Sequence, residues 1–407
     1  MLTFTFDMSP LVWLLTALAA IAAVAAVTLG FRPMLRLRRR AFSETTSYPA
    51  PPVSVIALSS KDIDPEHFIA QVTTQDYPDY EVIIVHESTS QAHEAFAERY
   101  QWQPEPLPQS DGDDDNPPAP RGCRAVRFCF YPPGAHALSQ KKLALAIGIK
   151  SAETDFVVTT STTCDIDSPR WLAAMMRNFS GDTDIVLGYA RRDYDQLPKR
   201  GRSLSRFENI MTAAQWISAA QEGNPYRGDG YNLAYRRDLF FSSKGFADTN
   251  DLVNGEDDIF IAANATADNT RMEFSDEATV VPRHGEETPR MFSDAREQYR
   301  FTSAWLPRAP FLKQGIASAA QWILWCSAIA AAAVALPNLA ATAISLLILI
   351  AVYLVQAFIY KKGAATLGDD RSWLLAPIFL LIRPIDNFVF DMRRRAHRYT
   401  NYTVRRQ

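Results

Sequence analysis

Long apolar stretches near both ends of the chain contrast with short apolar runs in its middle. Residues 10–31 contain no charged side chain and are long enough to cross a bilayer as a helix. Two further apolar stretches, residues 316–336 and 339–360, are separated by Pro337-Asn338, which favour a tight turn. The pattern predicts three transmembrane helices. A buried helical hairpin in a soluble protein is the alternative for the second and third.

Basic residues indicate how these helices are oriented. Arginines crowd residues 32–40, and Lys361-Lys362 follow the last apolar stretch. Positive residues stay on the cytoplasmic side, so the first helix should run inward and residues 41–310 should face the cytoplasm. A cleaved signal peptide carries its positive charge before the apolar run, which excludes that interpretation. We expect an integral protein of the cytoplasmic (inner) membrane with its main domain in the cytoplasm.

Residues 373–390 are apolar but interrupted by charge. Arg383 and Asp386 would each cost a few kcal/mol at the centre of a bilayer. An interfacial helix or a short re-entrant piece fits this pattern better than a full crossing. The following Arg393-Arg394-Arg395 run fits an anionic inner leaflet.

Short apolar runs rich in β-branched residues fill the middle of the chain. Residues 53–58 and 80–85 indicate buried parallel strands, and Phe68, Ile69 and Val72 indicate a helix between them. This βαβ unit predicts an α/β fold with a doubly wound, mostly parallel sheet. Further strands are predicted at residues 126–131, 155–160, 185–189 and 278–281, and helices at residues 141–152, 168–175, 203–221 and 258–267.

These patterns divide the chain into three parts. Residues 1–45 form an anchor and a basic juxtamembrane segment, residues 46–305 a cytoplasmic domain, and residues 306–407 a transmembrane hairpin, an interfacial helix and a basic tail. Within the domain, residues 101–121 are rich in proline and aspartate and have little to bury. They predict a solvated loop rather than a metal site.

Composition excludes some partners. The chain has 42 basic and 45 acidic residues, and arginines gather near both ends, so the middle is acidic. An acidic middle argues against binding nucleic acid. The four cysteines show no metal-ligand spacing and fit small buried residues of a reducing compartment.

The segment Gly255-Glu256-Asp257-Asp258 carries the candidate chemistry. Adjacent carboxylates are costly unless they are solvated, paired with cations or used to move protons. The apolar residues Ile259-Phe260-Ile261 can anchor a helix that fixes where the carboxylates point. An ordinary acidic helix N-terminus, favoured by the helix dipole, is the alternative.

Five short motifs occur in a fixed order along residues 51–305. They are Val53-Ser54-Val55-Ile56, Gln75-Asp76-Tyr77-Pro78-Asp79-Tyr80-Glu81-Val82, Lys141-Lys142-Leu143-Ala144-Leu145, Gly230-Tyr231-Asn232-Leu233-Ala234-Tyr235 and Gly255-Glu256-Asp257-Asp258. In this order, and with one flanking helix before and two after, the chain resembles membrane-anchored family 2 glycosyltransferases. The resemblance implies a GT-A-like sheet, one N-terminal and two C-terminal transmembrane helices, and an interfacial helix.

Members of this family transfer a sugar from a nucleotide-diphosphate donor, with Mg²⁺ or Mn²⁺ on the diphosphate. By resemblance, Asp257 is the general base, with Glu256 and Asp258 beside it. The resemblance and the strand ends together imply that the donor-binding residues are Ser59, Glu87, Lys141, Lys142, Ser161 and Thr163. The implied acceptor-binding residues are Gly228, Gly230, Asn232, Gln298 and Arg300. Lys141 and Lys142 equally fit a solvated helix face.

The chain departs from the family pattern at two places. The family's metal-binding Asp-x-Asp falls on Ser161-Thr162-Thr163, whose hydroxyls lack the charge that holds a hard cation. A displaced pair, Asp165 and Asp167, can supply a metal site or, for Asp167, a helix cap. The Gln-x-x-Arg-Trp motif of processive members is replaced by Gln298-Tyr299-Arg300-Phe301.

These observations leave three hypotheses. The first is an inverting glycosyltransferase that uses a nucleotide sugar and a lipid-linked or glycan acceptor at the inner membrane surface, in keeping with a role in the cell envelope. The second is a catalytically degenerate relative that binds a nucleotide sugar or supports an active enzyme. The third, a nucleotidyl- or phosphotransferase, lacks a glycine-rich phosphate loop. The sequence does not distinguish sugars, linkages, oligomeric states or processive from single transfer.

Overall fold

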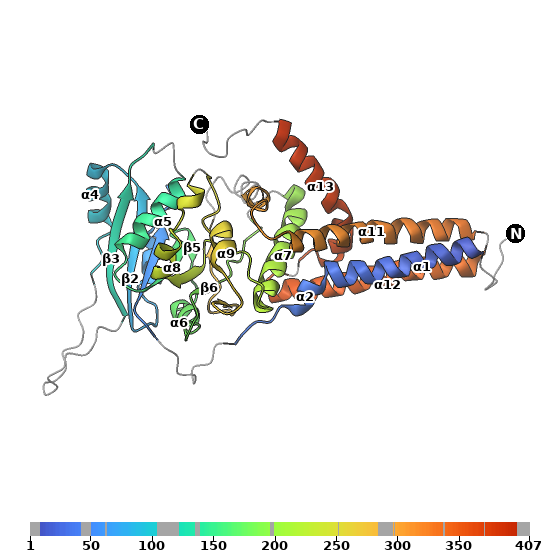
Figure 1. Ribbon diagram of the computed structural model, residues 1–407, viewed down its shortest axis with the longest axis horizontal. Coiled ribbons are helices and arrows are strands. Elements are labelled where there is room, and N and C mark those ends of the chain that lie inside the picture. The colour runs from blue at the N-terminus through green and yellow to red at the C-terminus, as the bar shows by residue number, and fades with distance from the viewer. Residues whose placement is uncertain are drawn as a thin grey trace. The chain divides into compact units, whose positions relative to one another are not determined.

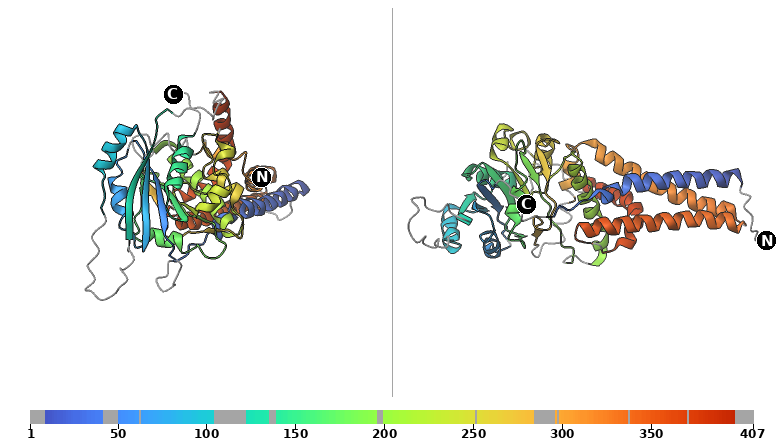
Figure 2. Two further views of the ribbon diagram at one scale, coloured as in Figure 1. Left: turned by 60° about the vertical axis from the view of Figure 1, so that its left-hand side comes forward. Right: turned by 90° about the horizontal axis from the view of Figure 1, so that it is seen from below.

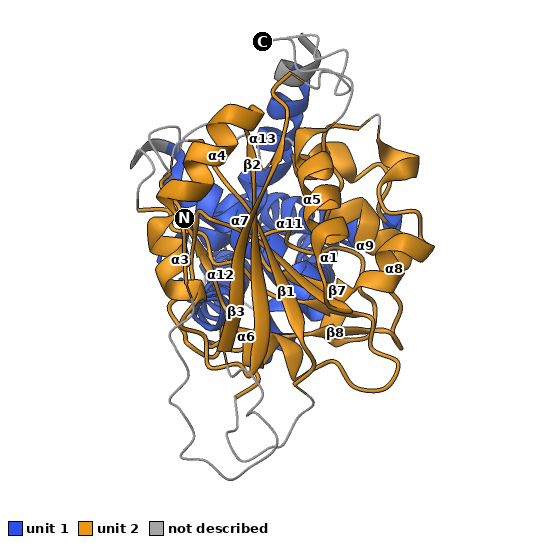
Figure 3. Ribbon diagram, turned by 90° about the vertical axis from the view of Figure 1, so that its left-hand side faces the viewer, with its two compact units in different colours: residues 1–38, 199–218, 307–399 blue, residues 39–198, 219–306, 400–407 orange. Residues whose placement is uncertain are grey.

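The computed structural model describes most of the chain, and its residues form two compact units. Described are residues 9–41, 50–61, 63–103, 122–134, 139–195, 199–250, 252–283, 296, 298–336, 338–369 and 371–396. Unit 1 takes in Met1–Arg38, Lys199–Ser218 and Pro307–Tyr399, and unit 2 takes in Arg39–Pro198, Ala219–Leu306 and Thr400–Gln407. Figure 3 colours the two units. Residues 104–121 of the predicted aspartate-rich loop lie outside the described residues.

Three long apolar helices, α1, α11 and α12, lie side by side in unit 1 (Figures 1 and 2). The bounds are α1 Pro10–Ala25, the π-helical turn η1 Ala26–Gly30, α2 Arg32–Arg36, α11 Arg308–Ala335 and α12 Leu339–Thr366. Small side chains line the contact between α1 and α11, among them Ala19, Ala22, Ala23 and Ala328. Small residues of this kind let helix backbones approach closely in a membrane.

The three predicted membrane spans correspond to helical stretches long and apolar enough to cross a bilayer. They are Pro10–Gly30, Arg308–Ala335 and Leu339–Thr366. Among the described residues, Trp373–Met392 also meets this measure of length and composition. It contains the stretch that the sequence analysis predicts to be interfacial.

Two further helices of unit 1 carry buried charge. They are α7 Lys199–Gln221 and α13 Ala376–Ala396, the latter preceded by the 3₁₀ turn η3 Trp373–Leu375. Arg383 of α13, 3% exposed, donates to Glu208 of α7 at 2.8 Å, and the ring of Phe207 lies 5.5 Å from that of Tyr360. The sequence analysis counts α7 within the segment 46–305. Its residues Lys199–Ser218 group with α11, α12 and α13 in unit 1.

Unit 2 is built on a sheet that, over the described residues, has seven strands in the order β3-β2-β1-β4-β7-β6-β8. The bounds are β1 Val53–Leu58, β2 Asp79–Glu87, β3 Gly122–Tyr131, β4 Phe156–Ser161, β6 Ile185–Leu187, β7 Leu233–Arg236 and β8 Thr270–Met272. The strands pair in parallel except at β7, which is antiparallel to β4 and β6. A separate antiparallel pair joins β5 Cys164–Asp165 to β9 Val281–Pro282.

Helices cover both faces of this sheet. The bounds are α3 Glu66–Val72, α4 Ser90–Arg99, α5 Gln140–Ser151, α6 Trp171–Met176, α8 Arg237–Ser242, the 3₁₀ turn η2 Ala247–Thr249 and α9 Asp258–Asn264. Phe68 of α3 and Trp171 of α6 pack with Val55 and Val82 in one core. Helix α5 covers the opposite face from α3 and α4 (Figure 3). The predicted doubly wound, mostly parallel sheet is thus confirmed.

Most predicted strands are confirmed, and the errors lie beyond β6. Strands β1, β2, β3, β4 and β6 match the predictions, although β6 is shorter than predicted. The sequence analysis predicts no strand between residues 189 and 278, whereas Leu233–Arg236 forms β7 in the centre of the sheet and Thr270–Met272 forms β8. The strand predicted at residues 278–281 reduces to β9 and a single bridge between Ala190 and Val280.

The contact between α5 and β1 gives a test of the packing. An alanine Cβ at Gly148 would lie 2.4 Å from Cγ2 of Ile56. We expect Gly148→Ala to destabilise the protein by about 1–3 kcal/mol, because overpacking outweighs alanine's better helix propensity. The melting temperature of the purified protein in detergent, followed by tryptophan fluorescence, measures this. Gly315→Ala in α11 is the control, since no atom lies within 4 Å of its added Cβ. Equal melting temperatures for the two variants would contradict the packing of α5 on β1.

Candidate active site

The carboxyl ends of β1 and β2 meet at one edge of the sheet. Leu58 pairs in register with Val85, and the N–H of Ser59 donates to the Val85 carbonyl at 2.9 Å. Lys61 then forms an ion pair with Glu87 at 2.9 Å, and the Glu87 side chain is only 10% exposed. Ser59 and Glu87, both predicted to bind a donor, therefore lie at the same edge.

The end of β4 adds a loop of hydroxyl side chains beside this edge. Oγ of Ser161 donates to the Leu58 carbonyl at 3.0 Å, and Oγ1 of Thr163 donates to Ser161 Oγ at 3.0 Å. Thr162 is 3% exposed, and its Oγ1 accepts from the N–H of Ser60 at 3.4 Å. These hydroxyls therefore bond chiefly within the loop and to the end of β1.

The acidic segment turns into α9 at a glycine. Gly255 has a φ of +108°, and an added Cβ there would lie 2.5 Å from Ile259. Only glycine adopts this backbone readily. Asp257 caps the helix, with its Oδ1 accepting from the N–H of Asp258 at 2.8 Å. The turn directs Glu256, Asp257 and Asp258 inward, where they are 2%, 8% and 0% exposed.

Two of the three buried carboxylates are neutralised by cations from distant segments. Lys141, at the start of α5, lies 2.5 Å from Glu256. Arg227 donates to Asp258 at 2.7 Å, and the hydroxyl of Thr302 donates to the other oxygen of Asp258 at 2.7 Å. Buried carboxylates without such partners would be strongly disfavoured.

Asp257 differs from its two neighbours because its contacts are neutral. Its Oδ2 accepts from the N–H of Gly230 at 3.1 Å, and its Oδ1 accepts from the Nε2 of Gln298 at 3.4 Å as well as from the N–H of Asp258. No cation among the described residues forms an ion pair with Asp257. The middle carboxylate is therefore held in place without being neutralised by a side chain.

The glycine loop before β7 packs directly on the acidic segment. An added Cβ at Gly230 would lie 3.0 Å from Oδ2 of Asp257, and one at Gly228 would lie 3.1 Å from Ile261. Both glycines thus permit close approach of the loop to α9. A side chain at Gly230 would crowd the Asp257 carboxylate, and a side chain at Gly228 would crowd Ile261 in α9.

Asn232, predicted to bind an acceptor, is buried and hydrogen-bonded within the core. Its side chain is 0% exposed and donates to the carbonyls of Tyr189 and Ala278 at 3.0 and 2.6 Å. Its Oδ1 accepts from the indole N–H of Trp171 at 3.1 Å. All of these contacts lie in the core, so the Asn232 side chain offers no exposed surface beside the glycine loop.

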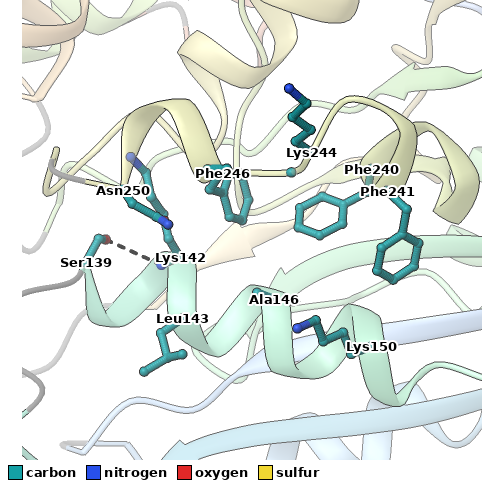
Figure 4. Close-up of a pocket in the computed structure, with 12 residues that line it drawn as sticks. Ser139, Lys142, Leu143, Ala146, Lys150, Phe240, Phe241, Lys244, Phe246 and Asn250 are labelled. Carbon is teal, nitrogen blue, oxygen red and sulfur yellow. Dashed lines mark hydrogen bonds between the residues drawn. The ribbon is translucent and has the colours of Figure 1, made fainter.

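The two adjacent lysines of α5 have different partners. Whereas Lys141 pairs with Glu256, the amine of Lys142 donates to the carbonyls of Thr249 and Leu252, the latter at 3.1 Å. Figure 4 shows Lys142 in a pocket of about 310 Å³ between α5 and the segment from Phe240 to Asn250. The donor-binding role predicted for Lys142 therefore has less support than that for Lys141.

The displaced pair Asp165 and Asp167 does not form a set of metal ligands. Oδ1 of Asp165 lies 3.2 Å from Nε2 of His67 and 2.5 Å from Nη2 of Arg283, whereas Asp167 is exposed. Over the described residues, no group of three or more histidine, cysteine, aspartate or glutamate side chains is arranged to hold a metal ion. Mg²⁺ is usually held by one or two carboxylates together with substrate phosphates. Here Asp165 is already engaged by two basic side chains and Asp167 is exposed, so the pair as arranged does not fit Mg²⁺ or Mn²⁺.

Cations instead surround Tyr231 in the glycine loop. The guanidinium of Arg192 lies 4.6 Å from the ring centre, and the amine of Lys141 lies 5.9 Å from it. Nη2 of Arg192 also contacts both carboxylate oxygens of Asp229 at 3.2 and 3.3 Å. Tyr231 therefore lies beside two positive groups on the same edge as the carboxylates.

The helical residues 298–302 also reach the acidic segment, although sequence reasoning singled out only part of this contact. Gln298 contacts Asp257, as described, and Arg300 lies half-buried in the same turn. Thr302 and Tyr299 were missed: Thr302 bonds Asp258, and the ring of Tyr299 lies 4.2 Å from the guanidinium of Arg227. Thr302 follows Gln298 by four residues, about one helical turn, and this spacing is the signal that would have indicated it.

Comparison with known proteins gives structural similarity at low sequence identity. No protein-family model matches the chain, and no curated protein matches it either. A mannosyltransferase from Pyrobaculum calidifontis, in complex with GDP-Man and Mn²⁺, has 18% identity and a TM-score of 0.49 over 93% of this chain and 99% of that chain. Glucosyl-3-phosphoglycerate synthase from Mycobacterium tuberculosis, in complex with Mn²⁺, UDP and glucosyl-3-phosphoglycerate, has 14% identity and a TM-score of 0.35 over 72% and 84%.

The buried carboxyl of Asp258 gives a prediction about proton binding. Burial raises its pKa to about 7, with Arg227 acting in the opposite direction. Asp258 should therefore take up its proton at a higher pH than an exposed aspartate does, because the effect of burial outweighs that of Arg227. Infrared titration of the carboxyl band in the wild type should show this step, and Asp258→Asn should remove it. Asp268→Asn, at an exposed position, should leave it unchanged. A step that persists in Asp258→Asn would contradict the assignment.

Proposed function

We propose that this protein is an inverting glycosyltransferase that moves a sugar, of hexosyl type, from a nucleotide-diphosphate donor to an acceptor hydroxyl. The observation that carries the proposal is the environment of Asp257. Among three adjacent buried carboxylates it is held by neutral donors, while Lys141 and Arg227 neutralise Glu256 and Asp258. A carboxylate that is positioned but not paired with a cation can accept a proton from a substrate.

The reaction is a single displacement. The acceptor O–H gives its proton to Asp257 as its oxygen forms a bond to the anomeric carbon of the donor. The bond from that carbon to the phosphate oxygen breaks, and its electron pair leaves with the nucleoside diphosphate. Attack opposite the leaving group inverts the anomeric centre.

The two sides of the acidic segment suit the two substrates. The edge formed by Ser59, Glu87 and the hydroxyl loop after β4 lies at the carboxyl ends of the parallel strands, where ligands of doubly wound sheets bind. Gly228 and Gly230 bring the backbone of the glycine loop before β7, where we place the acceptor, next to Asp257. Gln298 can orient the base, because its amide donates to a carboxylate oxygen.

We further propose that the reaction takes place at the cytoplasmic surface of the inner membrane, on a lipid-linked or glycan acceptor. Unit 1 supplies helices long and apolar enough to anchor the chain. Helix α13 suits an interfacial position because its exposed apolar residues recur at helical spacing while Arg383 is buried against Glu208. These exposed residues are Ile382, Ile385, Phe388 and Met392.

A second candidate is a catalytically degenerate relative that binds a nucleotide sugar or supports an active enzyme. The observation in its favour is the loop Ser161-Thr162-Thr163, whose hydroxyls bond chiefly within the protein. Such a protein would bind donor without turnover. A transfer assay therefore separates the two candidates.

Asp257→Asn tests the proposal. Membranes or purified protein are assayed against a panel of UDP- and GDP-sugars, with transfer and donor hydrolysis measured beside nucleotide binding. We expect Asp257→Asn to lower the rate by about 10²–10⁴-fold, since general base catalysis contributes that much, and to leave nucleotide binding within a factor of a few.

Asp268→Asn is the matched control, because the same change at an exposed carboxylate should leave the rate unchanged. A wild type that binds nucleotide but transfers no sugar from the panel would favour the degenerate relative. A full rate in Asp257→Asn would contradict the role of this carboxylate.

A further inference from the structure

Arg192 and Lys141 flank the ring of Tyr231, Arg283 is bonded to the hydroxyl loop after β4, and the carboxylates Asp165 and Asp167 do not fit a metal ion. We propose that Arg192, Arg283 and Lys141 hold the diphosphate of the donor directly, so that nucleotide binding needs no divalent cation. The inference rests on the proposed function, because it concerns the nucleotide diphosphate of the same site. It differs from the expectation of Mg²⁺ or Mn²⁺ that the family resemblance implies.

Arg283 is fixed to the hydroxyl loop through the backbone. Its N–H donates to the carbonyl of Thr163 at 2.7 Å, directly beyond the pairing of β5 with β9. Its side chain is 39% exposed and pairs with Asp165. The guanidinium thus lies beside the loop that aligns with the family's metal-binding aspartates. A positive group occupies the region where that family places carboxylates.

Arg192 carries an unsatisfied donor at the same place. Its Nη2 contacts Asp229, but its Nη1 is buried without a hydrogen-bond partner among the described residues. Such a group costs free energy unless a ligand supplies an acceptor. The guanidinium also lies over the ring of Tyr231. A phosphate oxygen is the acceptor that a guanidinium fork matches best.

Lys141 approaches the same ring from α5. Its amine lies 5.9 Å from the centre of the Tyr231 ring, and its side chain is 39% exposed although it pairs with Glu256. Ammonium groups have three donors, so a phosphate oxygen can be added to this ion pair. Arg192 and Lys141 therefore lie beside the same ring, where they can contact the two neighbouring phosphates of a diphosphate.

The carboxylates of the same region are already engaged. Asp165 contacts His67 and Arg283, and Asp229 contacts Arg192. A metal ion would have to displace these cations from the carboxylates before it could bind. Phosphate oxygens, in contrast, add to donors that are already in place. These contacts favour direct binding of the diphosphate by arginine and lysine side chains over binding through a metal ion.

The experiment measures binding of UDP and GDP to the purified full chain by calorimetry, first with excess chelator and then with Mn²⁺. We expect binding in chelator, with a Kd that Mn²⁺ changes less than about threefold. Arg192→Gln and Arg283→Gln should each weaken binding about 10- to 100-fold, the range for losing a charged hydrogen bond. Arg271→Gln, at an exposed site in β8, is the control and should bind as the wild type does.

A second variant separates loss of the cation from imbalance of charge. Arg283→Gln combined with Asp165→Asn removes both members of one ion pair. If the cation itself holds the phosphate, the double variant should bind nucleotide as weakly as Arg283→Gln does. Binding that requires Mn²⁺ and is lost in Asp165→Asn would overturn the inference in favour of a displaced metal site, while the proposed function would survive. Absence of any nucleotide binding, with or without Mn²⁺, would overturn the inference and the proposed function together.

Discussion

Three adjacent carboxylates can be buried only if other groups compensate their charge, and this constraint organises the candidate site. Glu256, Asp257 and Asp258 lie at the start of α9 with almost no exposure to water. Lys141 comes to them from α5 and Arg227 from the loop before β7. The helical residues 298–302 complete the enclosure. One electrostatic requirement thus joins segments that are separated by more than a hundred positions in the chain.

The negative charges of Glu256, Asp257 and Asp258 are compensated in different ways, and this difference affects their chemistry. Buried ion pairs contribute little net stability, since desolvation offsets most of their attraction, but they fix where each group lies. Glu256 and Asp258 are fixed in this way. Asp257 is fixed by N–H groups instead, so it is oriented while keeping its negative charge available to a proton. The neighbours' cations also limit the repulsion that would otherwise raise the cost of that charge.

The sheet was predictable because its signals are local. The β-branched runs that form β1, β2 and β4 are buried on both faces, as parallel strands require, and each run is contiguous in the sequence. Strand β7 was missed because its antiparallel place between β4 and β6 depends on partners far away in sequence. The grouping of α7 with α12 and α13 also depends on distant partners, since its contacts with Tyr360 and Arg383 cannot be read from its own residues.

The candidate site was predictable only in its acidic half. Glu256, Asp257 and Asp258 are adjacent in sequence and attract notice, whereas Arg192, Arg227 and Arg283 stand apart from one another and meet carboxylates that lie far away in the chain. The sequence places a candidate metal site at Asp165 and Asp167, because carboxylates are ligands that a hard cation prefers. Once folded, Asp165 meets His67 and Arg283 instead. The charge that a metal ion would have supplied is then already present as side chains, which is why the donor set around Asp165 does not fit a divalent cation.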